Sequence, residues 1–402
     1  MNEIPITVRA ERESAVYRIG EVVRFQVTGA GENFRWRIDD GVTVTEPAPL
    51  SAPEIVRTAD APGFLLVELL SGDQVVAKGG AAIEPEKIRP GVKTPADFAA
   101  FWSKELAAMR ETKRELLQKE PIPAKYLPAG FVGYDVAVRQ GDVTATGYLV
   151  MPADAKPGAL PAVMNFNGAS KVSAELPVAV DIAKTNRAIS FNLNFHGLAN
   201  FNLTEDRDRE REEKVKPQVA SYQFDFADDP RRYALRKIFL RVALAADFVR
   251  DLPEFDGRNL VAVGGSLGGC QALVCAALVP EVVYCISNAT AMCDHFGRDA
   301  GHLPGWPDLL AHNPAAATTA AYFDVVNFAG LVRCPTRMAV GFIDTTCPPA
   351  STYAAHNNLG TADKEMRHTV TGGHGGAQDP RDINVFDQHM ADLKKVLAAL
   401  KG

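Results

Sequence analysis

The chain has 402 residues, of which 47% are apolar and 23% charged, the balance of an ordinary globular protein. Its 43 lysines and arginines are outnumbered by 49 aspartates and glutamates, which gives a net charge of −6. This charge, without a long basic run, argues against nucleic acid or a membrane as a partner. No apolar stretch approaches the ~18 residues of a membrane-spanning helix. The first residues lack the basic and apolar segments of a signal peptide, so we expect none within this chain.

The six cysteines lie between residues 270 and 347, mostly inside apolar segments and without Cys-x-x-Cys spacing. This pattern predicts buried free thiols, with neither a zinc site nor a disulfide framework. We therefore expect no metal ion and no cofactor. Free thiols favour a reducing compartment, although large periplasmic enzymes also manage without disulfides.

The first 84 residues contain short apolar strands separated by Gly, Asp and Pro turns, without a helical period. The predicted strands are 6–10, 21–27, 34–38, 64–70 and 74–78. Several short strands without helices predict an antiparallel β-sandwich of immunoglobulin-like type. Trp36 alternates with Phe34 and Ile38, so we interpret it as a core residue rather than a platform for a sugar.

Residues 85–90 predict a linker, which makes 1–84 the first domain and 85–402 the second. In the second domain strands and helices alternate, which predicts a mostly parallel sheet with helices on both faces. Two segments, 200–228 and 293–322, exceed ordinary connections between elements. Long insertions often serve as lids or binding loops, so we expect both to shape the substrate site. The charge run within the first segment is typical of a solvated helix face.

The most informative stretch is Gly264-Gly-Ser266-Leu-Gly268. Residues 259–263 before it are apolar and β-branched, which indicates a buried strand, and 269–278 after it predict a helix. A serine at so sharp a strand-to-helix turn has strained backbone and an exposed hydroxyl, the nucleophile elbow of α/β-hydrolases. We therefore predict Ser266 as a nucleophile; the alternative is an idle serine in a glycine-rich turn.

The partners of such a serine follow it in the order acid, then histidine. Asp344 stands at the carboxyl end of a predicted strand over 337–343, where catalytic groups of open α/β sheets collect. His374 lies in the glycine-rich loop after a predicted strand over 365–370. Ser266, Asp344 and His374 thus form a candidate catalytic triad. Asp344 as a turn or helix-capping residue, His374 as a surface-loop histidine, and Asp294 or Asp299 as rival acids remain alternatives.

A triad also needs two backbone N–H groups that bind the developing oxyanion. One is expected from Leu267, the residue after the nucleophile. The other is expected from the loop that follows a buried strand over 162–166. Ala169 is the first choice there and Gly168 the second; a plain Asn-Gly turn is the alternative.

Several stretches resemble carbohydrate esterase family 7, the acetyl xylan esterase and cephalosporin C deacetylase family. Residues 94–102 are similar to its Pro-x-Asp-Phe-x-x-Phe-Trp lead-in helix, and 233–250 to its long helix before the elbow. Gly265-Ser-Leu-Gly-Gly269 is similar to its Gly-Ser-Gln-Gly-Gly. Most specific is 341–357, which is similar to the block where the catalytic aspartate precedes Cys-Pro-Pro-Ser-Thr. The resemblance spans about residues 90–402 and implies an α/β-hydrolase fold after the extra β-domain.

Three positions depart from the family pattern without touching the triad. The family has Arg-Gly-Gln where this chain has Asn-Phe-His196-Gly-Leu, a glutamine at Leu267 and a glutamate at Gly375. These departures bear on substrate choice and on the family's hexameric assembly, so a homo-oligomer is left open. His196 could line the substrate site, but a structural histidine that holds its loop is the favoured interpretation. Trp306, in the second insertion, is a further candidate for substrate binding.

The resemblance and the triad together predict a serine carboxylester hydrolase that removes acetyl groups from acetylated oligosaccharides or polysaccharides, xylan in the first place. A general carboxylesterase or peptidase on the same fold is one alternative. A carbohydrate-binding module with a relic hydrolase domain is another. We expect a periplasmic or secreted location, with the signal peptide absent from this chain, and the cytoplasm is the alternative.

Overall fold

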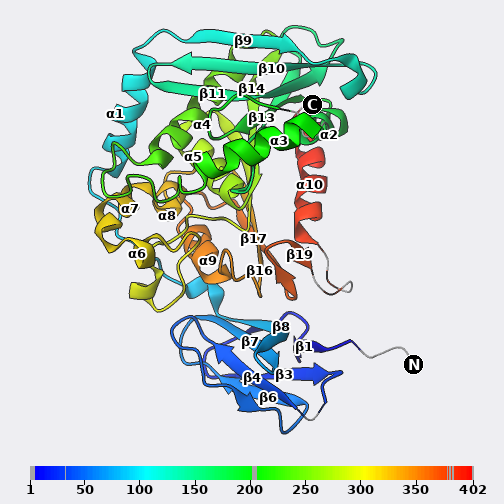
Figure 1. Ribbon diagram of the computed structural model, residues 1–402, viewed down its shortest axis with the longest axis vertical. Helices are drawn as coiled ribbons and strands as arrows, with labels where there is room; N and C mark the ends of the chain where they lie inside the picture. The colour runs from blue at the N-terminus through cyan, green and yellow to red at the C-terminus, as the bar shows by residue number, and fades with distance from the viewer. Residues whose placement is uncertain are drawn as a thin grey trace.

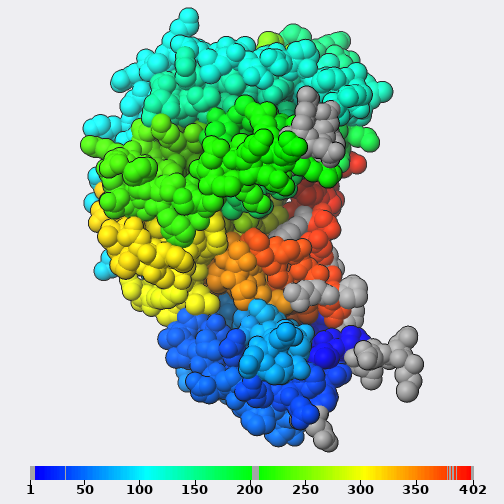
Figure 2. Space-filling model, viewed as in Figure 1, coloured from blue at the N-terminus to red at the C-terminus, as the bar shows by residue number. Residues whose placement is uncertain are grey.

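The computed structural model describes residues 5–31, 33–201, 206–377, 379, 382 and 384–400. The chain forms an all-β region of strands β1 to β8, called the β region below, and a larger α/β region from helix α1 onwards (Figure 1). In the space-filling view the blue β region lies against the orange and red segments that hold the last strands of the α/β region (Figure 2). Within the described part of the chain, no helix is long and apolar enough to cross a membrane.

The β region consists of two sheets. The antiparallel three-stranded sheet contains β1 (Thr7–Ala10), β3 (Val22–Thr28) and β6 (Glu54–Thr58), in the order β1-β3-β6. The five-stranded sheet has the order β2-β8-β7-β4-β5, with β2 (Val16–Tyr17), β8 (Gln74–Ile83), β7 (Gly63–Ser71), β4 (Phe34–Asp39) and β5 (Ala48–Pro49).

Side chains that alternate along the strands fill the space between these two sheets. Along β3, Val23 and Phe25 are buried while their neighbours are exposed, which is the period of a half-buried strand. They share one core with Val67 of β7, and Trp36 packs partly buried against it. An extra all-β region is therefore present, as the sequence predicts. Its immunoglobulin-like topology and its boundary at residue 84 stay predictions.

The α/β region is built on a nine-stranded sheet in the order β17-β16-β15-β14-β12-β13-β11-β10-β9. From β17 to β13 in this order, β12 included, neighbouring strands pair in parallel. The remaining neighbours pair antiparallel: β13 with β11, β11 with β10, and β10 with β9. The strands are β9 (Glu115–Pro121), β10 (Phe131–Gln140), β11 (Val143–Pro152), β12 (Leu160–Phe166), β13 (Ile189–Asn194), β14 (Phe255–Gly265), β15 (Val282–Asn288), β16 (Thr336–Gly341) and β17 (Lys364–Thr369).

Both faces of the parallel part of this sheet are apolar and both are covered by helices, as parallel strands require. The helices are α1 (Phe98–Arg110), α2 (Leu176–Asn186), α3 (Asp206–Val215), α4 (Ala234–Arg250), α5 (Leu267–Leu278), α6 (Leu309–His312), α7 (Ala317–Phe323), α8 (Val325–Ala329), α9 (Pro349–Asn357) and α10 (Val385–Leu400). One core joins α1, α4, α5 and α8 to the sheet. A second core, on the opposite face, joins α2 and α10 to it.

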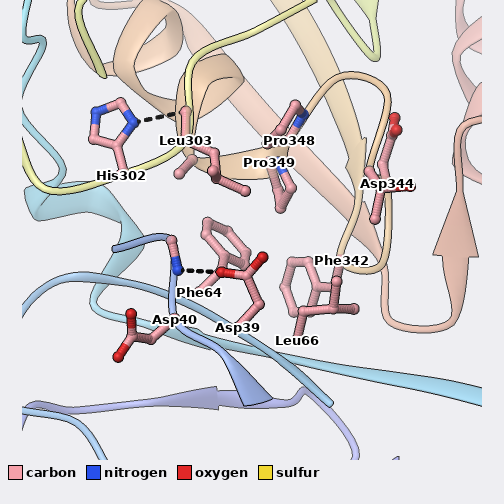
Figure 3. Close-up of a pocket in the computed structure, with 13 residues that line it drawn as sticks. Asp39, Asp40, Phe64, Leu66, His302, Leu303, Phe342, Asp344, Pro348 and Pro349 are labelled. Atoms are coloured by element: carbon pink, nitrogen blue, oxygen red, sulfur yellow. Dashed lines mark hydrogen bonds between the residues drawn. The ribbon is translucent and has the colours of Figure 1, made fainter. Parts of the chain in front are cut away.

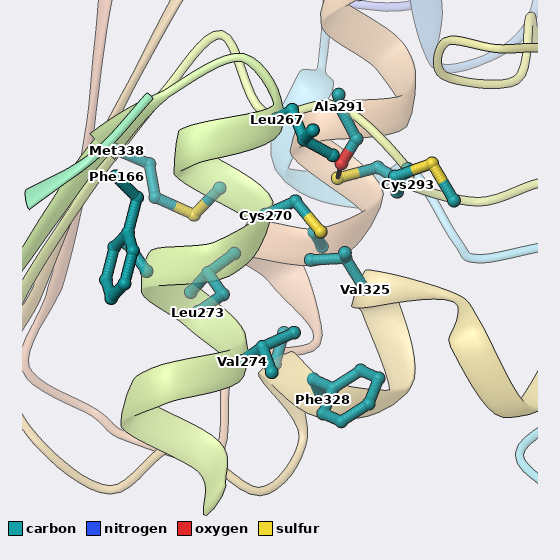
Figure 4. Packing of buried hydrophobic residues seen from close by; sticks show 14 of the residues in the cluster. Phe166, Leu267, Cys270, Leu273, Val274, Ala291, Cys293, Val325, Phe328 and Met338 are labelled. Carbon is teal, nitrogen blue, oxygen red and sulfur yellow. Dashed lines mark hydrogen bonds between the residues drawn. The ribbon is translucent and has the colours of Figure 1, made fainter. Parts of the chain in front are cut away.

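Helix α5, which follows Ser266, is buried on almost all sides. Cys270, Leu273 and Val274 lie among Phe166 and Val325, which come from a strand end and from α8 (Figure 4). A helix that is apolar all round belongs in the interior of a domain, so the residues at its start are held firmly. All six cysteines are buried free thiols.

Candidate active site

Ser266 stands at the junction of β14 and α5 with φ 58° and ψ −124°. A positive φ strains any residue with a side chain, and such strain persists only where the surroundings over-determine it. Here the Ser266 N–H donates to the Asn288 carbonyl at 2.9 Å, and the Ser266 carbonyl accepts from the Ala291 N–H at 3.1 Å. The expected sharp turn between strand and helix is therefore present, and the backbone on both sides holds it.

Glycines around Ser266 are required because other backbone comes close. A Cβ on Gly264 would collide with the Gly268 carbonyl, and a Cβ on Gly268 would collide with the Phe166 carbonyl. Gly265 differs, because a Cβ there would meet only the Asn288 carbonyl at an ordinary 3.7 Å. The outer glycines of the motif thus allow β12, β14 and α5 to converge beneath the serine.

His374 bridges the other two predicted triad residues. Its Nδ1 lies 2.8 Å from Asp344 Oδ2 and its Nε2 lies 3.0 Å from Ser266 Oγ. A carboxylate can only accept, so the Nδ1–H donates to Asp344, and a neutral imidazole then offers Nε2 as an acceptor to the serine hydroxyl. The three side chains predicted from the sequence are thereby brought into one hydrogen-bonded chain.

Asp344 is buried in the loop after β16, with only 3% of its surface exposed. Its Oδ1 accepts from the backbone N–H groups of Thr346 and Cys347 at 2.8 and 2.9 Å, which leaves Oδ2 for His374. The rival Asp294 is engaged elsewhere, by backbone N–H groups of residues 91 and 92 and by a histidine, and Asp299 is exposed. Asp344 is therefore the carboxylate that faces His374.

His374 lies in the turn of a short hairpin formed by β18 (Gly372–Gly373) and β19 (Gly376–Ala377). Four of the residues in 372–376 are glycines and contribute no side-chain packing. The base of the hairpin is closed by Thr371, whose N–H and hydroxyl both donate to Asp382 Oδ2, at 2.8 and 2.6 Å. His374 remains partly exposed, with 31% of its side chain accessible.

The predicted oxyanion donors lie on two sides of the serine. Leu267 is the first residue of α5, where backbone N–H groups have no partner within the helix. Across from it, Gly168 faces Ser266 so closely that a Cβ there would be 3.8 Å from the serine Cβ. This places the loop after β12 next to the nucleophile. Ala169 and Gly168 both remain predictions for the second donor.

Beneath that loop lies a buried amide network that the sequence reasoning missed. Asn192 Nδ2 donates to the side-chain oxygens of Asn165 and Asn167, and Asn167 Nδ2 donates back to Asn192 Oδ1 at 3.0 Å. Asn192 Oδ1 also accepts from the Glu175 N–H. The signal for this network is the alternation of Asn165 and Asn167 at the end of β12, together with Asn192 in the buried strand β13. Satisfied amides in a core fix one arrangement, so the network holds the loop in place.

A cavity of about 280 Å³ opens beside the nucleophile. Ser266 and His374 line it together with Asn288 and, from α10, Asp387 and Met390. Its size is near the lower end of small-molecule sites, which suits an acyl group or a single sugar unit. Helix α10 was not expected at this site, because no motif within it indicates chemistry.

His196 and Trp306 do not line this cavity. Each of them has its ring close to the ring of Tyr222. The His196 ring lies 5.0 Å from Tyr222 and 4.1 Å from Phe195, and the Trp306 ring lies 6.5 Å from Tyr222. Burial, with the Arg241 cation nearby, lowers the pKa of His196 to about 4, so this imidazole is neutral at ordinary pH. Substrate binding by His196 and Trp306 stays a prediction. Tyr222, between them, carried no motif and was missed.

The two long segments predicted as lids contact one another. Tyr222 of the first meets Trp306 of the second, and Phe224 lies 4.9 Å from His312. Residues 202–205 of the first segment lie outside the described residues. Among those described, no cluster of three or more His, Cys, Asp or Glu could hold a metal ion.

Comparison with known proteins assigns the chain to a family. The sequence pattern of the family described as acetyl xylan esterase (AXE1) matches residues 84–299 and 311–387. Acetyl esterase Axe7A of Xylanibacter ruminicola is 30% identical over 322 residues, which span 79% of this chain and 72% of that protein. The chain belongs to the acetyl xylan esterase family. As a member of this family it is a serine esterase.

Solved structures agree with the α/β-hydrolase fold. The acetyl xylan esterase from Paenibacillus sp. R4 has a TM-score of 0.63 at 22% identity, over 78% of this chain and 98% of that one. Acetyl xylan esterase 1 from Thermoanaerobacterium sp. JW/SL YS485 has a TM-score of 0.59 at 21% identity, with the same shares covered. The matched family pattern begins at residue 84, so the β region lies outside it.

Proposed function

We propose that this esterase removes acetyl groups from acetylated saccharides, with xylan and xylo-oligosaccharides as the main substrates, and that Ser266, His374 and Asp344 are its catalytic triad. The observation that carries the proposal is the position of His374, within hydrogen-bond distance of both partners. Membership of the acetyl xylan esterase family supports the acetylated substrate. It does not favour a peptidase or a relic module.

Acylation begins when Ser266 Oγ attacks the acetyl carbonyl carbon while its proton passes to His374 Nε2. Asp344 holds the imidazole orientation and stabilises the imidazolium that forms. The oxyanion is bound by the N–H of Leu267 and by an N–H from the loop at 168–169. The bond between the carbonyl carbon and the sugar oxygen then breaks, and that oxygen takes the proton from His374. An acetyl-enzyme and a free sugar hydroxyl result.

Deacylation repeats these steps with water in place of the serine. His374 takes a proton from the water, whose oxygen attacks the acetyl carbonyl. Collapse of this second tetrahedral intermediate returns the proton to Ser266 Oγ and releases acetic acid as acetate. The same donors stabilise both intermediates, so no group beyond the triad and the two N–H groups is required.

The test is acetate release from acetylated xylo-oligosaccharides, measured beside hydrolysis of 4-nitrophenyl acetate. Ser266→Ala should lower both activities by roughly 10⁵-fold or more. Ser103→Ala, an exposed serine on α1, is the matched control and should leave both unchanged. Activity on the nitrophenyl ester alone would contradict the saccharide substrate and retain the triad. Full activity in Ser266→Ala would contradict the triad itself.

A further inference from the structure

We propose that the β region is part of the catalytic unit: Arg9 positions the hairpin that carries His374, and Phe64 positions the loop that carries Asp344. This inference rests on the proposed triad and goes beyond it, because the β region contributes none of the three side chains. Both contacts join β1 or β7 to segments near the end of the chain, where the two regions meet (Figure 2).

Arg9, on β1, makes a two-pronged ion pair with the segment after the His374 hairpin. Its Nη1 donates to Asp379 Oδ2 at 2.7 Å and its Nη2 donates to Asp382 Oδ1 at 2.8 Å. The arginine side chain is 22% exposed and the two carboxylates 12% and 11%, so solvent screens these pairs weakly. Charge-assisted hydrogen bonds of this kind are about twice as strong as neutral ones.

Asp382 passes this constraint to the base of the hairpin. Its second oxygen accepts from both the N–H and the hydroxyl of Thr371, and the Asp379 N–H donates to the same hydroxyl oxygen at 3.1 Å. Although burial raises the pKa of Asp382, hydrogen bonds from Thr371 and Arg9 outweigh it and hold that pKa below its ordinary value. The carboxylate is therefore ionised at neutral pH and bridges Arg9 to Thr371, three residues before His374.

The hairpin needs such a constraint because it has little stability of its own. Its two strands have two residues each, and isolated hairpins even of greater length are marginal in water. Glycine also loses more conformational freedom on ordering than any other residue. The contacts at the base of the hairpin must therefore supply the stability that the glycines do not, and Arg9 provides the positive charge in these contacts.

The second contact acts on the loop of Asp344. The Phe64 ring packs edge-on against Phe342, with centroids 5.2 Å apart, and Phe342 precedes Asp344 by two residues (Figure 3). On the adjacent strand β8, Gly80 leaves space for Phe342, since a Cβ there would be 2.7 Å from the Phe342 Cβ. On the other side, Phe342 stacks on His368 of β17 at 4.6 Å. Phe342, and with it the loop of Asp344, is thus packed between the β region and β17.

The two contacts predict a specific kinetic defect. A displacement of about 1 Å at a catalytic group can cost as much as 10²-fold in rate. Loosening the His374 hairpin should therefore lower kcat. Among the described residues, Arg9 pairs with Asp379 and Asp382, and neither carboxylate lines the cavity beside Ser266, so KM should change little.

The experiment compares Arg9→Ala, Arg9→Lys and the control Arg24→Ala in the full chain. Arg24 also lies in the β region, but its ion pairs are with Glu54 and Glu11 of that same region. We measure kcat and KM for 4-nitrophenyl acetate and hydrogen exchange of the peptide over 371–377. Arg9→Ala should lower kcat about tenfold or more, with KM within about twofold, and should speed exchange of this peptide. For Arg9→Lys, both kcat and the exchange rate should lie between those of Arg9→Ala and the wild type, since lysine keeps the positive charge but cannot bind two carboxylates through a planar guanidinium.

Unchanged exchange in 371–377 together with wild-type kcat in Arg9→Ala would overturn the inference. So would an equal loss in Arg24→Ala, which would show general destabilisation. If Arg9→Ala does not fold, Arg9→Lys carries the same test. Hydrogen exchange does not depend on activity, so failure of the proposed function appears separately, as a wild type that hydrolyses no acetyl ester or a Ser266→Ala variant that still does.

Discussion

Ser266 is fixed by residues close to it in the chain and in the same sheet, whereas His374 depends on Arg9, which lies 365 positions earlier in the chain. Around the serine, the turn is determined by the start of a buried helix and by two backbone hydrogen bonds, one donated by Ser266 to the Asn288 carbonyl and one accepted from the Ala291 N–H. Around the histidine, a glycine-rich hairpin is closed by Thr371 and by an arginine of the β region. The nucleophile is therefore built into the α/β region, while the base is held in part from outside it.

The largest expected effect concerns Asp344, the carboxylate that orients His374 towards Ser266. Asp344→Asn keeps the shape of the side chain but no longer fixes the imidazole tautomer that presents Nε2 to Ser266. We expect kcat to fall about 10⁴-fold with KM nearly unchanged. Asp299→Asn, an exposed aspartate on the second insertion, is the matched control. A loss of less than tenfold would mean that another carboxylate serves His374.

The local construction of the elbow predicts a difference between two adjacent glycines. Gly264→Ala should destabilise the fold by roughly 1–3 kcal/mol and reduce activity, because its Cβ meets the Gly268 backbone. Gly265→Ala should be tolerated, because its Cβ would have 3.7 Å to the nearest atom. Thermal unfolding and kcat of the two variants check this. Equal behaviour would contradict the packing described for the strand end.

The contact between the two regions predicts that two buried phenylalanines of the β region differ in their effect on catalysis. Phe64→Leu should lower kcat several-fold, because it removes the ring that packs on Phe342 near Asp344. Phe25→Leu, in the core of the β region, should cost similar stability, about 1 kcal/mol, without the kinetic loss. Both are measured well below the midpoint of thermal unfolding. A kinetic loss in Phe25→Leu alone would reverse the assignment.

Buried histidines predict a smaller effect, on stability in acid. Burial lowers the pKa of His196 to about 4, and the same cause acts on His295, His356 and His389. A base whose pKa is lower in the folded state stabilises the fold above its unfolded pKa, about 6.5, and this stability is lost as the pH falls towards 4. Each contributes a slope of up to about 1.4 kcal/mol per pH unit in that window.

His196→Gln isolates one of these groups, since glutamine does not titrate. The free energy of unfolding, measured by urea denaturation between pH 7 and 4, should fall less steeply in the variant than in the wild type. His312→Gln, a histidine on α6 at the surface, provides the control. Parallel slopes for all three proteins would contradict the buried, neutral state of His196.

Local features of the site could be predicted from the sequence, and long-range ones could not. The elbow around Ser266 is a strand, a turn and a helix in succession. Asp344 and His374 could be found because each follows the end of a predicted strand, in the order expected for a triad. The pairing of Arg9 with Asp382 could not be predicted, because neither sequence segment has a motif or a periodicity that indicates its partner. The amide network of Asn165 and Asn192 likewise depends on the crossover that sets β12 beside β13. The strands β9, β10 and β11 carried no chemistry and were not singled out.

The most direct test of the account is to trap the acyl-enzyme. The enzyme is mixed with excess 4-nitrophenyl acetate, quenched in acid within the first turnovers and digested, and the peptides are examined by mass spectrometry. We expect one acetyl group on Ser266. It should be absent from the Ser266→Ala variant, and its amount should rise when deacylation is slowed. Release of acetate with no acetyl on Ser266, or with acetyl on another residue, would contradict the account.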